Sequence, residues 1–417
     1  MGETMYCLTW IKDLLKQHFH EPYYRLGNGT SISSLSDDII IDILSRLDAK
    51  SVLACKLVCS PWHRLCTTPY FAEIHQNRAT TATIATRMFL GQNRSYNDGH
   101  KSTRYMFVVE ECGKYSKFKK VSIKLEGFPQ IYELDYKLYD SCNGFVLFFT
   151  TPHYHLVHHI PQYYVIYNPI TREKASFREK GLNLCGFFYN QLDKDYKILF
   201  FGINEYNMTC QYYTYGFCTK SKRKIGSSPY APLRFNGPAV SVYGALFWMV
   251  CDTNDRYPRE CSKSIMMFNL TKESFHVMPH PGANCTYGGR WSTWGMHEQM
   301  RLLDVNELLS FSNLCEKMVE VWVLEDLANW MWVKRYVVNF DQPYNSDARY
   351  RCLDHPVVGI QNGKLLLHWP SRGLFWCDLR SNLLYKMAKD SSIDKHVCVF
   401  HGTRYTGSFV SLERLDK

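Results

Sequence analysis

The sequence of 417 residues lacks the short motifs that mark the common enzyme classes. It contains no glycine-rich phosphate-binding loop, no zinc-protease helix and no nucleophile-elbow pentapeptide. Its sixteen cysteines include no pair separated by two residues, the spacing typical of zinc knuckles and redox motifs. We therefore expect no catalytic residues, no cofactor and no metal site, and we predict that the protein is not an enzyme.

Long apolar runs and export signals are also missing. The longest apolar runs, such as residues 245–251, fall far short of a membrane span. Lys12, Asp13 and Lys16 interrupt the N-terminal apolar residues, so no signal peptide is expected. Cysteines in a chain without an export signal are expected to be reduced and buried. We therefore expect an intracellular protein, in the cytoplasm and/or nucleus, with no membrane partner.

Acidic residues are too few to balance the basic ones, and the formal net charge is +10. Residues 1–80 hold eight of each kind, so the excess lies downstream, where 41 basic residues face 31 acidic ones. No basic helix or RNA-binding motif accompanies the two basic clusters, so we expect solvated turns and no nucleic-acid partner. The clusters are Lys114, Lys117, Lys119 and Lys120, and Lys220, Lys222, Arg223 and Lys224.

Residues 35–75 have the periodicity of several short helices. Ser36 precedes two acids and an apolar stripe, which is typical of an N-cap and a helix start. A second apolar segment spans 52–58, and Ser60-Pro61 and Thr68-Pro69 each resemble a capped helix start with proline in the first turn. Such small helices cannot bury all these apolar faces in one another. Another surface is therefore expected to cover them.

This stretch resembles the F-box, a module that docks on the Skp-family adaptor of SCF ubiquitin ligases. It departs from the family pattern at Ser36, Asp48, Ala54 and Ser60; serine and aspartate at the first two sites can cap a helix where proline usually starts it. The alternative is a helical cap that packs on the rest of the chain. The matching residues are Leu35, Asp37, Ile39, Ile40, Ile43, Leu44, Leu47, Lys50, Ser51, Leu53, Val58, Cys59, Trp62, Pro69, Phe71, Ala72 and His75.

The resemblance implies that the helices bind the adaptor and, through it, the cullin and RING subunits. The apolar positions that exceed what the module can bury are the predicted adaptor-binding residues. They are Leu35, Ile39, Ile43, Leu47, Leu53, Val58 and Trp62.

From Tyr105 onward, short aromatic and β-branched runs alternate with turn residues, as in antiparallel sheets. Polar turns recur at residues 168, 218, 269, 325 and 378, separated by 50, 51, 56 and 53 residues. A second set of hairpins, at 143–144, 193–195, 244, 306–307 and 362–363, keeps the same period. This pattern predicts a β-propeller of about six blades. Two β-sandwich domains are the alternative.

The same region resembles the F-box-associated domain of plant F-box proteins, although it lacks the repeated double glycine of kelch repeats. The fold class is therefore an α+β multidomain chain, with a small all-α F-box before an all-β, kelch-like propeller. The resembling pieces are residues 141–149, 163–173, 186–201, 240–250, 265–281 and 319–336. We divide the chain into an extension (1–34), the F-box (35–75), a connector (76–104) and the propeller (105–417).

The combined resemblance implies a substrate-recognition subunit of an SCF-type ubiquitin ligase, with an unknown protein substrate. Loops carry recognition in rigid scaffolds, and the longest irregular stretches are 251–263, 279–300 and 339–356. Arginines and aromatic residues in these stretches would suit an acidic or phosphorylated target. The predicted substrate-binding residues are Arg256, Arg259, Arg290, Trp291, Trp294, Tyr350 and Arg351.

Two other function classes remain open from the sequence. A propeller enzyme or lectin with a helical cap would need acids, histidines or arginines that converge on one face. A basic nucleic-acid-binding propeller would need the basic clusters free for phosphates. The histidines at 153, 155, 158 and 159 have no acid or cysteine among them, and we interpret this segment as a polar loop rather than a metal site.

Overall fold

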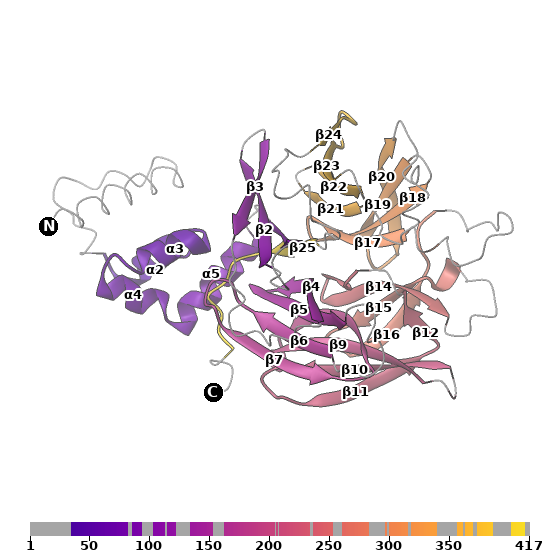
Figure 1. Cartoon of the computed structure of the whole chain (residues 1–417), viewed down its shortest axis with the longest axis horizontal. Helices are drawn as coiled ribbons and strands as arrows, with labels where there is room; N and C mark the ends of the chain where they lie inside the picture. The colour runs from indigo at the N-terminus through magenta and orange to yellow at the C-terminus, as the bar shows by residue number, and fades with distance from the viewer. Residues whose placement is uncertain are drawn as a thin grey trace.

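A computed structural model shows a small group of helices beside a set of antiparallel sheets (Figure 1). Among the described residues, no helix is both long and apolar enough to cross a bilayer. The structure describes residues 35–81, 86–93, 103–112, 115–121, 134–152, 162–204, 206, 208–233, 237–252, 261–282, 297, 300–315, 318–339, 357–361, 363–369, 373–386 and 402–412.

The helical module begins with α2 (Asp37–Leu44) and α3 (Ala49–Cys55), followed by α4 (Ser60–Cys66) and α5 (Pro69–Thr81). Asp48 caps α3, because its carboxylate accepts hydrogen bonds from the Ser51 amide (3.0 Å) and hydroxyl (2.6 Å). Thr68 caps α5 by accepting from the Phe71 amide at 3.1 Å. Two of the expected caps differ: Ser36 stands at the N-cap of α2 without a side-chain hydrogen bond, and Cys59 precedes α4 where Ser60 was expected.

Strands from both ends of the β region share one sheet. β25, near the C-terminus, pairs with β1, which pairs with β2, so the two chain ends are joined by backbone hydrogen bonds. This closure fits a propeller, in which a ring of sheets leaves few exposed edges. The sheet consists of β25 (Gly402–Tyr405), β1 (Thr86–Asn93), β2 (Thr103–Cys112) and β3 (Tyr115–Val121).

The other sheets follow one another along the chain, and each places its earliest strand at one edge. With the shared sheet, the described strands form six sheets, and the expected propeller is confirmed. They are β4 (Leu134–Cys142), β5 (Phe145–Pro152), β6 (Gln162–Tyr167) and β7 (Lys174–Glu179); β8 (Asn183–Asn190), β9 (Asp195–Asn204), β10 (Thr209–Gly216) and β11 (Lys222–Ser228); β12 (Tyr230–Pro232), β13 (Val240–Val242), β14 (Ala245–Asp252), β15 (Ile265–Asn269) and β16 (Ser274–Met278); β17 (Met300–Val305), β18 (Leu308–Cys315), β19 (Met318–Asp326) and β20 (Met331–Asn339); and β21 (Val357–Gln361), β22 (Lys364–Trp369), β23 (Gly373–Asp378) and β24 (Leu384–Lys386).

The recurring polar turns share one geometry. Asn168, Asn269, Asp326 and Asp378 each accept hydrogen bonds from the backbone amides two and three residues later. Such side-chain turns close hairpins without help from the rest of the fold. The fifth residue of each turn has a positive φ; these residues are Arg172, Glu273, Trp330 and Asn382. The period found in the sequence therefore marks the hairpin between the last two strands of each sheet.

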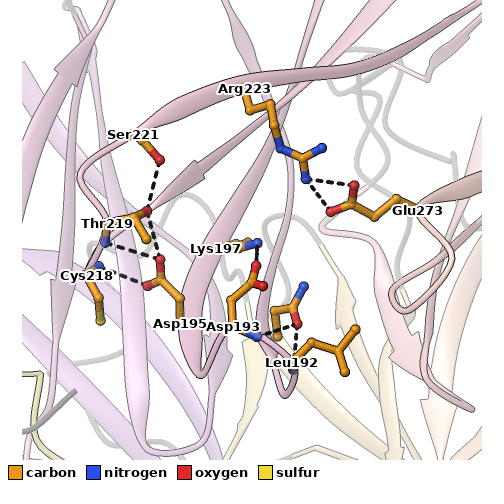
Figure 2. Close-up of polar contacts among 10 residues, drawn as sticks. Leu192, Asp193, Asp195, Lys197, Cys218, Thr219, Ser221, Arg223 and Glu273 are labelled. Carbon is orange, nitrogen blue, oxygen red and sulfur yellow. Dashed lines mark hydrogen bonds and ion pairs between the residues drawn. The ribbon is translucent and has the colours of Figure 1, made fainter. Parts of the chain in front are cut away.

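One repeat replaces this device with a contact from another hairpin (Figure 2). Gly216 stands where the asparagine or aspartate would be, and the buried Asp195 supplies the carboxylate instead. Asp195 accepts from the Cys218 amide at 2.9 Å and from the Thr219 hydroxyl at 3.1 Å. A Cβ on Gly216 would lie 2.2 Å from the Asp195 carboxylate oxygen, so only glycine fits.

Ion pairs join the outer strands of neighbouring sheets. Lys222 on β11 contacts Glu179 on β7 at 3.0 Å, and Arg223 on β11 contacts Glu273 at 2.7 Å (Figure 2). Exposed pairs of this kind stabilise a fold only slightly. Their consequence is that two of the four cations in the cluster at 220–224 already face carboxylates.

The domain boundaries differ from the predicted ones. Helix α5 continues to Thr81, past the predicted F-box end at 75, and β1 lies inside the predicted connector 76–104. The predicted propeller start at 105 would cut through β2 and remove β1 from its sheet. Sequence indicated only a short strand here, because the partner strand β25 lies about 300 residues away.

Candidate docking surface on the helical module

The structure separates the seven predicted docking residues into three groups. Leu47 and Trp62 are buried in the core of the helical module, with 4% and 7% of their surface exposed, so they cannot face a partner. Ile39 and Leu53 are 48% and 37% exposed. The remaining three, Leu35, Ile43 and Val58, are partly buried.

Leu57 was missed by the sequence analysis, yet it is 86% exposed. Helical periodicity grouped it with the buried stripe of the second helix. The helix instead ends at Cys55, and the amides of Leu57 and Val58 donate to carbonyls three residues back. This tighter turn rotates the Leu57 side chain away from the core. We call Ile39, Leu53 and Leu57 the exposed apolar set.

The buried thiols of the module are packing residues. Cys55 and Cys66 are free, buried and part of the helical core. Burial raises the pKa of the Cys66 thiol to about 12 and that of Cys55 to about 11. Both are therefore protonated at neutral pH and act as small hydrophobic side chains, as expected from the sequence.

The C-terminal segment, residues 405–412, passes beside α5 and joins the helical module to the sheets (Figure 1, yellow trace). Phe409 is 4% exposed and lies in the core of the helical module. Its ring centroid is 6.1 Å from that of Phe71 and 5.2 Å from that of His75, and Lys56 lies 4.3 Å above it. The module therefore has a core that the F-box residues do not complete alone.

Asn168 holds the other side of this segment. Its side-chain amide donates to the carbonyls of Ser408 and Val410, both at 3.0 Å. The same side chain accepts from the turn amides, so both ends of this fully buried group are satisfied. At Gly144, which has φ +86°, a Cβ would lie 2.2 Å from the Cβ of Ser408. The contacts clamp the segment between the helices and the sheet of β4 to β7.

Arg78 fixes the far end of α5 to α2. It contacts the Asp42 carboxylate at 2.6 Å and donates to the Asp42 carbonyl at 2.8 Å. Arg46 contacts the same carboxylate at 3.1 Å. Hydrogen bonds from Arg46 and Arg78 hold the pKa of Asp42 below its usual value despite some burial. The exposed residues on α2 are thus carried by a helix whose orientation is set by α5.

His75 makes this joint sensitive to pH. Its Nε2 donates to the Leu47 carbonyl at 2.9 Å, and no described residue accepts a proton from the buried Nδ1. Burial lowers the pKa of His75 below 6.5. Because the unfolded chain then binds the proton more readily, stability is full above about pH 6.5 and falls as the pH drops toward the folded-state pKa.

We therefore expect the full chain to lose resistance to urea as the pH falls below about 6.5. His75→Gln keeps a donor for the Leu47 carbonyl but cannot be protonated, so its unfolding midpoint should change less over the same range. The pKa of the buried His280 is also lowered, so the comparison with wild type isolates the part due to His75. Equal pH profiles for the two proteins would contradict the assignment.

None of the seven predicted substrate-binding residues lies in the described part of the chain, and neither do the histidines between 153 and 159. The described residues do enclose a cavity of about 770 Å³ near the early strands of the sheets. Asp140, Arg301 and Asp304 line it, and Gln76 of α5 and Thr406 of the C-terminal segment lie at its edge. The cavity and the helical module are therefore on the same side of the propeller.

Comparison with known proteins agrees with this architecture. A model of the F-box domain matches residues 32–73, and a model of the F-box associated beta propeller domain matches residues 104–370. The chain belongs to the F-box-associated β-propeller family. A putative F-box protein of Arabidopsis thaliana is 21% identical over 314 residues, covering 73% of this chain and 74% of the relative.

A second F-box relative from Arabidopsis thaliana, named an F-box/LRR-repeat protein, is 23% identical and covers 84% of this chain and 77% of its own. Among solved structures, TolB from Acinetobacter baumannii aligns over 80% of this chain and 73% of its own, with 10% identity and a TM-score of 0.42. The family assignment rests on the two domain matches, and it makes the helical module an F-box.

Proposed function

We propose that this F-box protein is the substrate-recognition subunit of an SCF-type ubiquitin ligase. The observation that carries the proposal is the exposed apolar set of Ile39, Leu53 and Leu57 on an F-box whose core is already complete. Single exposed leucines are ordinary, but here they belong to a module of a family that docks on an adaptor. The Skp-family adaptor would cover them and connect the chain to the cullin and RING subunits.

The chain itself would contribute position and no bond chemistry. Ubiquitin transfer needs a target lysine held close to the charged conjugating enzyme, and tethering raises their effective concentration. A loosely attached propeller would spread the substrate over a large volume. The contacts of Phe409 and Asn168 with the F-box and with the sheets instead give the two domains a defined joint.

We place substrate recognition on the propeller, with Arg256, Arg259, Arg290, Trp291, Trp294, Tyr350 and Arg351 as the proposed contacts, and the whole complex inside the cell. An acidic or phosphorylated protein target suits these side chains. The nucleic-acid alternative is weakened at residues 220–224, where Lys222 and Arg223 face Glu179 and Glu273.

Reconstitution tests the proposal directly. The purified full chain and a Skp-family adaptor should elute together from a sizing column, with the mass of a one-to-one complex by light scattering. Proteins that co-purify with the tagged chain under proteasome inhibition should then include the substrate. Separate elution, together with salt-sensitive retention of the chain on nucleic acid, would contradict the proposal and favour the nucleic-acid alternative.

A further inference from the structure

Three side chains with metal-binding atoms meet at the edge of the fourth sheet in the chain. Cys261 begins a short 3-10 helix, Cys261–Lys263, just before β15. His280 follows β16, and His297 precedes β17 of the next sheet. One ligand atom from each lies within 4.8 Å of the other two, although the residues are far apart in sequence.

Their spacing fits a tetrahedral metal. The Cys261 Sγ lies 3.6 Å from the His297 Nε2. A zinc ion at about 2.3 Å from sulfur and about 2.0–2.1 Å from nitrogen, with a tetrahedral angle between them, requires a sulfur–nitrogen distance of about 3.6 Å. The pair therefore has the separation of two ligands on one ion without any movement.

The surroundings of His280 orient it as a ligand. Its Nδ1 lies 2.8 Å from the Pro281 carbonyl, which can only accept, so Nδ1 carries the proton and Nε2 has its lone pair available. This outer hydrogen bond is the arrangement found behind most metal-binding histidines. The imidazole also stacks on Phe311, with centroids 5.7 Å apart and planes at 5°.

Ser264 ties two of the three residues together. This buried hydroxyl donates to the Cys261 carbonyl and accepts from the His280 amide, both at 2.9 Å. His280 and His297 are 7% and 2% exposed, and their rings meet edge to face at 5.3 Å. The three residues are thus held together by the backbone and by packing before any ion binds, which reduces the entropic cost of binding.

We propose that Cys261, His280 and His297 form a zinc site. One thiolate and two imidazoles are the ligands that zinc prefers, whereas magnesium and calcium prefer oxygen. The thiolate cancels one of the two ionic charges, and water completes the coordination. This inference does not depend on the proposed ligase function.

The site joins segments that have no other covalent link. Cys261 directly follows residues 253–260, and His280 and His297 flank residues 283–296. Five of the seven proposed substrate contacts belong to these two stretches: Arg256, Arg259, Arg290, Trp291 and Trp294. Zinc would therefore anchor the ends of both stretches to the same point of the propeller.

Zinc affinity of the full chain tests the proposal. Metal-free protein is titrated with zinc chloride against a chromophoric chelator, under reducing conditions. Wild type should bind one zinc ion tightly, and Cys261→Ser and His297→Gln should bind it at least about 100-fold more weakly, because losing even an outer-shell partner costs 10–100-fold. The matched controls Cys218→Ser and His276→Gln, which alter a cysteine and a histidine outside the cluster, should bind as wild type.

Two further readouts do not depend on how well the variants fold. Cobalt should give wild type the visible bands of tetrahedral coordination and a thiolate charge-transfer band, and the latter should be missing in Cys261→Ser. Zinc should also raise the melting temperature of wild type, because it binds the folded state. Equal zinc affinity in wild type and both ligand variants, or octahedral cobalt bands in wild type, would overturn the site and leave Cys261 and His297 as a hydrogen-bonded pair.

Discussion

Aspartate at both Ile39 and Leu57 is expected to abolish adaptor binding without unfolding the F-box. Both side chains are largely exposed, so the charges remain in water in the free protein. In the complex each would have to be buried without a partner. Because an interface hot spot contributes about 2 kcal/mol or more, the double variant should bind at least about 100-fold more weakly by isothermal titration calorimetry.

Matched controls come from the propeller. Leu192 and Ile203 are 70% and 49% exposed, close to the exposure of Leu57 and Ile39, and aspartate there should leave adaptor affinity unchanged. Leu47→Asp should also lose binding, but by unfolding the F-box, since Leu47 is buried. Circular dichroism distinguishes the two causes. A folded Ile39→Asp/Leu57→Asp protein that still binds the adaptor would place the docking surface elsewhere.

The repeat architecture was predictable because its hairpins are encoded locally. Asn168, Asn269, Asp326 and Asp378 each form a turn with their own neighbours, so the period is visible in the sequence. Asp195 shows the limit of this reasoning. It serves a turn more than twenty residues away, and only the three-dimensional structure relates it to Gly216.

The docking surface was predicted only in part, since apolar periodicity identifies a helix face but not which part of it remains uncovered. Trp62 and Leu47 satisfied the pattern and turned out to be core residues, whereas Leu57 is exposed because its helix ends early. The cluster of Cys261, His280 and His297 ran against the expectation of no metal site. Its spacing in the sequence matches no compact motif, and the fold alone brings it together.

Phe409 had no local signal either, and its replacement by alanine is expected to have the largest effect on stability. The ring fills the space between Phe71, His75 and the Lys56 side chain, far from all three in sequence. Removing a buried phenylalanine typically costs about 3–5 kcal/mol through lost burial and the cavity left behind. Urea unfolding of the full chain should show a loss of this size in the transition of the F-box.

The location of the damage separates a joint from ordinary core packing. In Phe409→Ala, amide hydrogen exchange should accelerate in α5 and in the C-terminal segment and remain unchanged in β9 and β10. Phe217→Ala, a comparable deletion in the core of the propeller, should give the opposite pattern.

Adaptor binding should survive in Phe409→Ala, because Ile39, Leu53 and Leu57 lie outside the cavity, while substrate ubiquitination in a reconstituted ligase should slow. The reason is geometric: a propeller that pivots on a loosened joint holds the target lysine near the conjugating enzyme for less of the time. If exchange in α5 and substrate ubiquitination both match wild type, the C-terminal segment does not set the orientation of the F-box on the propeller.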